Sequence, residues 1–114
     1  MSITRTDSNQ RMSQIVEHGD TVYLAGQVAT GETVAEQSAG ILAQIDALLA
    51  KAGTDKSKLI TATIWLCSMD DFAEMNEVWD AWIDPANPPA RACVESPRLA
   101  TPEFRVEMMV VAAK

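Results

Sequence analysis

The sequence predicts an α+β fold of two layers, in which two helices cover one face of a single sheet and the elements follow the order β-β-α-β-α-β-β. Two segments carry apolar residues at helical spacing, and five carry the alternation or the β-branched and aromatic residues typical of strands. The 114 residues contain no linker, repeat or low-complexity stretch and match the usual size of one domain. Residues 1–114 are therefore predicted to form a single domain.

The first two strands are expected to form a hairpin. Met12–Val16 reads as a strand that leads to a turn at Gly19-Asp20. Thr21–Val28 is the stronger strand, because it is rich in β-branched and aromatic residues.

The first helix is predicted over Val34–Ala52. Thr33 and Glu36 have the spacing of a capping box, in which each side chain satisfies a free backbone N–H at the helix start. Gly53 is a natural residue for the helix end. The apolar stripe that follows the cap has helical spacing and consists of Val34, Ile41, Leu42, Ile45, Leu48 and Leu49.

A strand is predicted over Leu59–Cys67, followed by the second helix. Ser68 can cap this helix, and Asp70 and Asp71 suit its first turn because negative charge favours a helix N-terminus. Pro85 and the following prolines end it. In the strand, Ile60, Ala62, Ile64 and Leu66 are assigned to one face and Thr61, Thr63, Trp65 and Cys67 to the other. The helix places Phe72, Met75, Trp79 and Trp82 on one side, a spacing typical of core packing.

The last two strands are predicted over Arg91–Ser96 and Glu103–Ala112. Two helices cover only one face of such a sheet, and a second face with many apolar residues is usually buried. The chain has no spare element to cover it, so we expect another copy of the chain to do so. The apolar residues assigned to this second face are Tyr23, Trp65, Cys67, Cys93, Met109 and Val111.

Charge and targeting signals exclude several classes of function. The net charge of −7 argues against nucleic acids and anionic membrane surfaces, whose binding depends on Lys and Arg. Cys67 and Cys93 have no metal-site spacing, and the single histidine, His18, lies at a predicted turn, so no metal site is expected. The N-terminus resembles neither a signal nor a transit peptide, and we expect a cytoplasmic protein with free thiols.

Two charged residues stand out on the final strands. Arg91 follows Asn-Pro-Pro-Ala and is predicted to project from the second sheet face, where it can form an ion pair with Glu95, Glu103 or Glu107 or can bind a small carboxylate. Glu107 lies between apolar residues and is assigned to the same face as Arg91. It is either an ion-pair partner or a site carboxylate. The residues alone leave both pairs of alternatives open. Cys93 has no histidine base near it, which favours a half-buried thiol over a nucleophile.

These same residues carry a family resemblance. Pro89-Ala-Arg-Ala-Cys-Val-Glu95, followed by Val106-Glu-Met108, resembles the C-terminal signature of the RidA family, also called the YjgF family, of reactive enamine and imine deaminases. Ala25-Gly-Gln27, Asp71-Phe-Ala-Glu-Met-Asn76 and the order of elements agree with it. The resemblance covers the chain from about Arg11 to Ala112.

The resemblance implies a chorismate-mutase-like fold, a homotrimer with small-molecule sites between subunits, and no cofactor or metal. It implies hydrolysis of 2-imino or 2-enamino acids to 2-keto acids and ammonium. Arg91 would bind the substrate carboxylate and Glu107 would position the water. Cys93, Asn76 and Gly26 would line the pocket.

The chain departs from the RidA pattern at two positions. Met12 stands where that subgroup has a tyrosine, and Ala25 where it has a serine. Both changes remove a hydroxyl from the expected pocket and indicate a sister subgroup. A module that binds a keto acid or similar carboxylate without turnover is therefore the alternative function.

Overall fold

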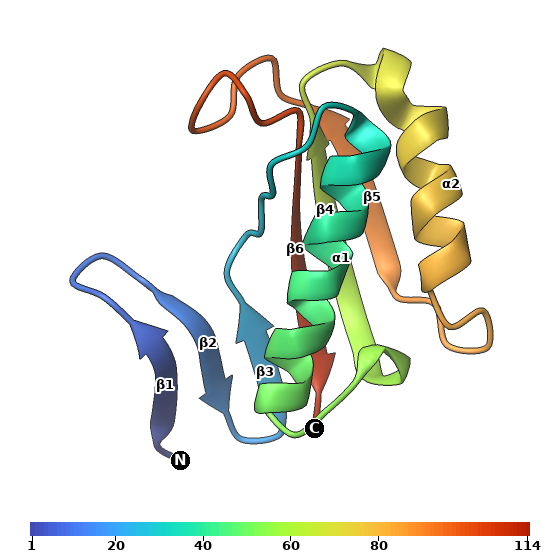
Figure 1. The fold of residues 1–114 in the computed structure, drawn as a ribbon. Coiled ribbons are helices and arrows are strands. Elements are labelled where there is room, and N and C mark those ends of the chain that lie inside the picture. Colours follow the sequence, from blue (N-terminus) through green and yellow to red (C-terminus); the bar gives the residue numbers. More distant parts are fainter.

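The computed structural model describes residues 1–114 as a mixed α+β fold with one six-stranded sheet. Figure 1 shows both helices on one face of the sheet, as the sequence predicts. The strands lie in the order β1-β2-β3-β6-β4-β5, and only the β4–β5 pair is parallel. Neither helix is both long and apolar enough to cross a membrane. The elements are β1 (Ile3–Ser8), β2 (Ser13–His18), β3 (Thr21–Leu24), α1 (Val34–Lys51), η1 (Lys56–Lys58), β4 (Leu59–Leu66), η2 (Met69–Asp71), α2 (Phe72–Trp82), β5 (Ala90–Glu95) and β6 (Val106–Ala113).

The predicted order of elements lacks one strand that the structure contains, β1. β1 pairs antiparallel with β2 at the edge of the sheet, so the order is β-β-β-α-β-α-β-β. Its side chains are mostly exposed, and Ile3 is its only apolar residue. A strand with no buried face has no apolar alternation, so the pattern that reveals the other strands is missing here.

The boundaries of the other strands shift by a few residues. β2 begins at Ser13 because Met12 still belongs to the turn, where its N–H donates to Asn9 Oδ1 at 2.9 Å. β3 ends at Leu24 rather than at Val28, and β6 begins at Val106 rather than at Glu103. The backbone of residues 25–28 and 103–105 does not form a regular strand.

The first helix forms as its cap predicts. Thr33 Oγ1 accepts a hydrogen bond from the Glu36 N–H at 3.0 Å. Glu36 Oε2 reaches back to the Glu32 N–H at 2.9 Å, one residue before the expected partner. At the other end Gly53 has φ +81°, a left-handed conformation that costs glycine little.

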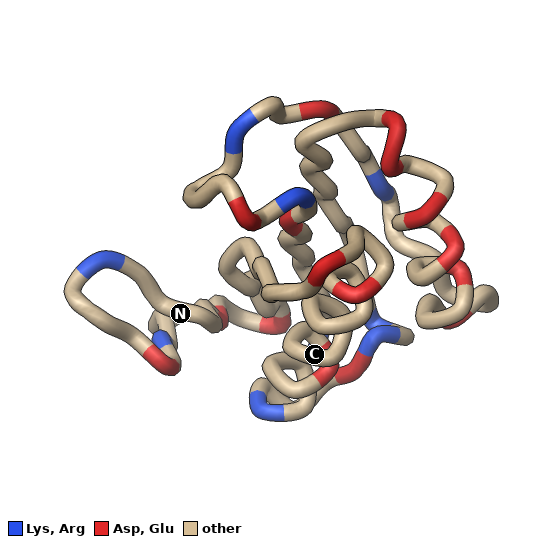
Figure 2. Tube along the Cα trace, turned by 45° about the horizontal axis from the view of Figure 1, so that its top comes forward, with Lys and Arg blue, Asp and Glu red and all other residues tan.

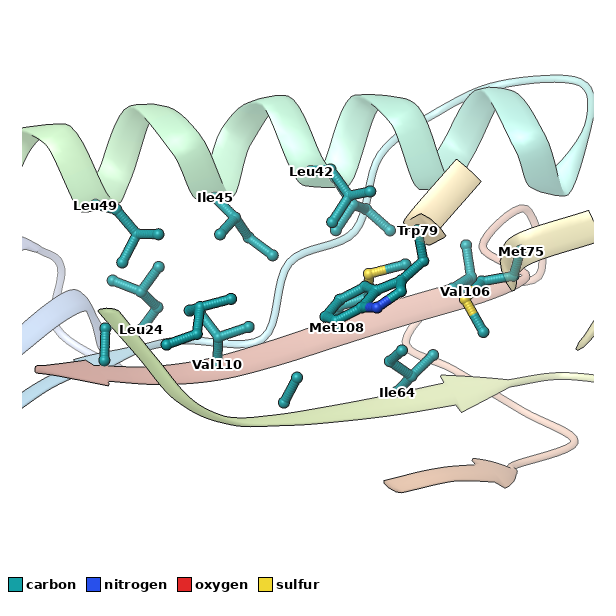
Figure 3. Packing of buried hydrophobic residues seen from close by; sticks show 14 of the residues in the cluster. Leu24, Leu42, Ile45, Leu49, Ile64, Met75, Trp79, Val106, Met108 and Val110 are labelled. Atoms are coloured by element: carbon teal, nitrogen blue, oxygen red, sulfur yellow. The ribbon is translucent and has the colours of Figure 1, made fainter. Parts of the chain in front are cut away.

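The core lies between the two helices and the covered face of the sheet (Figure 3). Buried apolar residues of α1 and α2 pack against alternate residues of β3, β4 and β6. The cluster contains Ile15, Val22, Leu24, Val34, Ile41, Leu42, Ile45, Leu49, Leu59, Ala62, Ile64, Leu66, Met75, Trp79, Val106, Met108, Val110 and Ala112.

One buried polar side chain ties α1 to the start of β6. Gln37 is 1% exposed, and its Nε2 donates to the carbonyl oxygens of Gly31 at 3.1 Å and Glu103 at 2.9 Å. Its Oε1 accepts from the Arg105 N–H at 2.9 Å. These three bonds satisfy the buried amide and fix the segment that leads into the last strand.

A bulge in β4 overturns one predicted side-chain assignment. Leu59 pairs with Ala112 and Thr61 with Val111, so one extra residue, Ile60, lies between these pairs. Ile60 is 44% exposed, whereas Ile64 on the same strand is fully buried. The extra residue breaks the strict alternation on which the assignment of Ile60 to the core relied.

This difference predicts unequal effects of the same substitution. We expect Ile64→Ala to lower the free energy of unfolding by about 2–5 kcal/mol, because it removes buried methyl groups and leaves a cavity. Ile60→Ala should cost less than about 1 kcal/mol, because its side chain is largely in solvent. Chemical denaturation of both variants measures the difference, and equal losses would show that the bulge is misplaced.

Candidate functional site

The site residues expected from the sequence fall into two groups on opposite faces of the sheet. Arg91 pairs in register with Ala62, which is buried under the helices. Glu107 pairs in register with Trp65, three residues further along the same strand. Side chains an odd number of residues apart on a strand point to opposite faces. The prediction that Arg91 and Glu107 share a face is therefore wrong.

Glu107 lies on the face without helices, beside Gly26. Tyr23 pairs with Val111 and Gln27 with Met108, so one extra residue is accommodated after β3. A β-carbon on Gly26 would collide with the Glu107 carboxylate and would lie 3.1 Å from its Cδ. Glycine at this position leaves the space that the carboxylate occupies.

Hydrogen bonds hold the Ala25–Gln27 segment against its neighbours. The Gln27 N–H donates to Met108 O at 2.8 Å, and the Met108 N–H donates to Gln27 O at 3.1 Å. Gln27 Nε2 donates to Gln14 Oε1 at 2.8 Å, and the Ala25 N–H donates to Gln14 O at 2.9 Å. These bonds fix the residues before and after Gly26, so Gly26 stays next to Glu107.

The Glu107 carboxylate has no partner in its own chain. It takes part in none of the three ion pairs and accepts no hydrogen bond, although its side chain is half-buried. The face around it is largely apolar, as the sequence predicts. Its large apolar members are Val16, Tyr23, Trp65, Val94, Met109 and Val111.

Arg91 lies at the edge of the sheet, on the side of the helices. Its guanidinium carbon stands 5.3 Å from the centroid of the Trp79 ring of α2. It forms no ion pair with Glu95, Glu103 or Glu107, the three partners considered from the sequence. Glu95 instead accepts a hydrogen bond from the Met69 N–H at 3.0 Å.

Cys93 also lies on the helix side, which corrects its assignment to the open face. It pairs in register with the buried Ile64 and packs against the core. Burial raises the pKa of its thiol above the ordinary value, and the positive charge of Arg91 partly offsets this rise. A raised pKa keeps the thiol protonated at neutral pH, which agrees with a residue that lines a pocket rather than a nucleophile.

Asn76 lies one helical turn before Trp79 on α2, so the two residues share a side of the helix. Its Oδ1 is buried and has no hydrogen-bond partner. Asn76, Arg91 and Cys93 therefore form one group along α2 and β5.

Gly26 and Glu107 form the second group. Ala25 precedes Gly26, and Met12, which is 38% exposed, leads into β2. β5 and β6 lie on either side of β4, about 10 Å apart at the usual strand spacing. Because the two groups also face opposite ways, one copy of the chain does not bring them together around a small molecule.

The sequence predicts core packing for Trp79, which the structure confirms, and only the folded chain shows that its ring also lies beside Arg91. Apart from the site residues, a hollow of about 300 Å³ lies beside the end of β4, lined by Cys67, Phe104, Arg105 and residues 97–102. No cluster of three or more His, Cys, Asp or Glu residues in the structure could hold a metal ion.

Comparison with known proteins identifies close relatives. A family model described as Endoribonuclease L-PSP matches residues 2–114. The RutC family protein YoaB of Escherichia coli is 43% identical over 114 residues, which cover 99% of each chain. A RutC family protein of Haemophilus ducreyi is 43% identical over 113 residues, covering 97% of this chain and 96% of its own. A solved YjgF family structure from Neisseria meningitidis is 49% identical with a TM-score of 0.97, and the match covers 100% of this chain and 96% of that one.

The proximity of Arg91 and Cys93 predicts a pH dependence. In Cys67→Ser protein, the thiolate of Cys93 should form with a midpoint above that of an ordinary cysteine, because burial disfavours the charged form. Arg91→Ala should move the midpoint higher still, since it removes a positive charge that stabilises the thiolate. Ultraviolet thiolate absorbance against pH measures both midpoints, with a protein lacking both cysteines as the blank. A midpoint that falls or stays fixed in Arg91→Ala would contradict the geometry.

Proposed function

The chain belongs to the Endoribonuclease L-PSP family, and on this premise we propose that it hydrolyses reactive 2-imino and 2-enamino acids to 2-keto acids and ammonium. The observation that carries the proposal is the pair of unpartnered charges on opposite faces of the sheet. Arg91 offers free hydrogen-bond donors, and Glu107 offers a free carboxylate. A second copy of the chain would bring one next to the other.

The apolar open face supports assembly of the chain with itself. Tyr23 is 45%, Val94 48% and Met109 37% exposed, and these residues lie on the same face. A soluble protein rarely leaves so many large apolar side chains of one sheet in water. The family resemblance implies a homotrimer, and a cyclic arrangement gives every interface one Arg91 and one Glu107.

Arg91 is assigned to bind the substrate carboxylate. A guanidinium presents paired N–H donors whose spacing matches the two oxygens of a carboxylate. Binding in this way orients the imine carbon toward the neighbouring subunit. Asn76, whose buried Oδ1 has no hydrogen-bond partner in the chain, is assigned to the lining of the pocket, as the family resemblance implies.

Glu107 is assigned to activate water. Its carboxylate accepts a proton from a water molecule as the water oxygen forms a bond to the imine carbon, and the imine nitrogen takes up a proton. The resulting tetrahedral adduct has a hydroxyl and an amino group on one carbon. Glu107 then returns its proton to the amino group, the C–N bond breaks with loss of ammonia, and the hydroxyl proton passes to ammonia, which leaves ammonium and the keto group. A 2-enamino acid first tautomerises to the imine by gaining a proton on carbon and losing one from nitrogen. No electron is transferred, so atoms and charge balance without a cofactor.

The pocket is expected to be less polar than in the RidA pattern. Met12 and Ala25 supply no hydroxyl. The same two residues favour the second candidate function, a module that binds a keto acid without turnover. Binding of a keto acid together with no effect on imine lifetime would identify this alternative.

Cleavage of RNA, which the family description names, is disfavoured by charge. The net charge is −7, and acidic residues follow one another along α2 (Figure 2). The phosphates of RNA bind to clustered Lys and Arg side chains. The negative net charge of this chain repels them instead.

A coupled assay tests the deaminase proposal. An amino-acid oxidase generates imines in place, semicarbazide traps those that remain, and the protein should lower the yield of semicarbazone. We expect Arg91→Ala and Glu107→Gln each to lower the rate by about 10²-fold or more, since one binds the substrate and the other moves the proton. Lys58→Ala, which changes an exposed cation of η1 that takes part in no ion pair, serves as the control and should retain full activity.

The outcomes separate the candidate functions. Full activity of Arg91→Ala would refute the assignment of Arg91 and with it the proposed site. Absence of any effect of the wild-type protein, over a panel of amino acids, would leave only the binding function.

A further inference from the structure

Arg91 is held by its contact with an aromatic ring rather than by an ion pair. The guanidinium carbon lies over the Trp79 ring, 5.3 Å from its centroid. A cation over an aromatic face is attracted by the electron density of the ring, which requires no N–H bond. The side chain makes no ion pair within the chain. Its position is therefore restrained while its donors stay free.

Another arginine of the same chain shows the alternative arrangement. The Nη2 atom of Arg105 lies 3.1 Å and 3.2 Å from the two carboxylate oxygens of Asp71. That pair neutralises the guanidinium and occupies its donors, so Arg105 serves the fold. A carboxylate beside Arg91 would compete with an anionic substrate in the same way, whereas an indole ring does not.

The Trp79 ring is itself rigidly supported. Trp79 is 5% exposed and enters the core from α2 (Figure 3). Its centroid lies 5.3 Å from that of Trp82, with the planes tilted by 55°. The Trp82 Nε1–H donates to Asp46 Oδ2 of α1 at 2.9 Å, and Lys56 Nζ stands 5.0 Å from the Trp82 centroid. Trp82, which contacts α1 and η1, thus supports the Trp79 ring on which Arg91 rests.

We propose that Trp79 is a positioning residue, which holds the Arg91 guanidinium over its ring so that the free donors face the carboxylate of a 2-imino acid. This inference rests on the proposed function, because it assigns Arg91 the same role. The inference gives Trp79 a role in the reaction in addition to its packing in the core. Trp79 need not touch the substrate, since it acts through Arg91.

Kinetics of Trp79→Leu and Trp79→Phe test this role. We expect Trp79→Leu to raise KM for the imine about tenfold with little change in kcat, because Arg91 loses its support while Glu107 is untouched. Trp79→Phe keeps a smaller ring and should raise KM less. Phe72→Leu removes an exposed aromatic ring at the start of α2 and is the matched control, with KM unchanged.

A fluorescence titration provides a readout that leaves Trp79 intact. The variant Trp65→Phe keeps Trp79 together with its neighbour Trp82, and the same titration of Trp65→Phe/Trp79→Phe gives the contribution of Trp82 to be subtracted. Pyruvate, a 2-keto acid of the product class, should change the emission of Trp79 saturably, because its carboxylate pairs with the Arg91 guanidinium and so changes the charge beside the Trp79 ring. Adding Arg91→Ala should abolish that change.

The outcomes distinguish this inference from the proposed function. Full activity of Arg91→Ala overturns the proposed function and this inference together. An inactive Arg91→Ala beside a folded Trp79→Leu with unchanged KM overturns the role of Trp79 alone. A fall in kcat with unchanged KM would make Trp79 a packing residue only. If Trp79→Leu fails to fold, the fluorescence titration decides. An emission that does not change when pyruvate binds would refute the positioning role of Trp79.

Discussion

Alternation of side chains along a β-strand is the constraint on which the chemistry of this protein depends. β4 separates β5 from β6, and its register directs Arg91 toward the helices and Glu107 toward the open face. A substrate small enough to be a 2-imino acid cannot reach both charges within one copy. In the proposed function, self-association is therefore part of the reaction, and the apolar open face provides the surface for it.

The remaining architecture keeps these charges available. Gly26 leaves room for the Glu107 carboxylate, and the Gln37 amide anchors the chain that enters β6. On the other side of the sheet, Trp79 restrains Arg91 without occupying its donors. Glu107 is half-buried and has no partner in its chain, and a carboxylate in such a position is costly unless a ligand or another chain pairs with it.

The sequence predicts the covered parts of the fold well because their apolar periodicity and caps are strong local signals. These signals predict α1, α2 and the buried strands. The sequence does not reveal β1, because that strand buries almost nothing, and the alternation assigns Ile60 to the wrong face, because a bulge leaves no sign in a short apolar run. The site residues were named from motifs, but the faces of Arg91 and Cys93 were wrong. Their strand is the parallel edge of the sheet, and its register against β4 is set by contacts distant in sequence.

The most direct measurement is complementation between two inactive variants in one oligomer. Arg91→Ala and Glu107→Gln proteins carrying different tags are unfolded, mixed and refolded together, and mixed oligomers are isolated through both tags. We expect these to regain imine hydrolysis, because in every mixed cyclic trimer one of the three interfaces combines an intact Arg91 with an intact Glu107. Mixed oligomers that remain as inactive as either parent, while wild-type protein refolded in the same way is active, would contradict a site shared between copies.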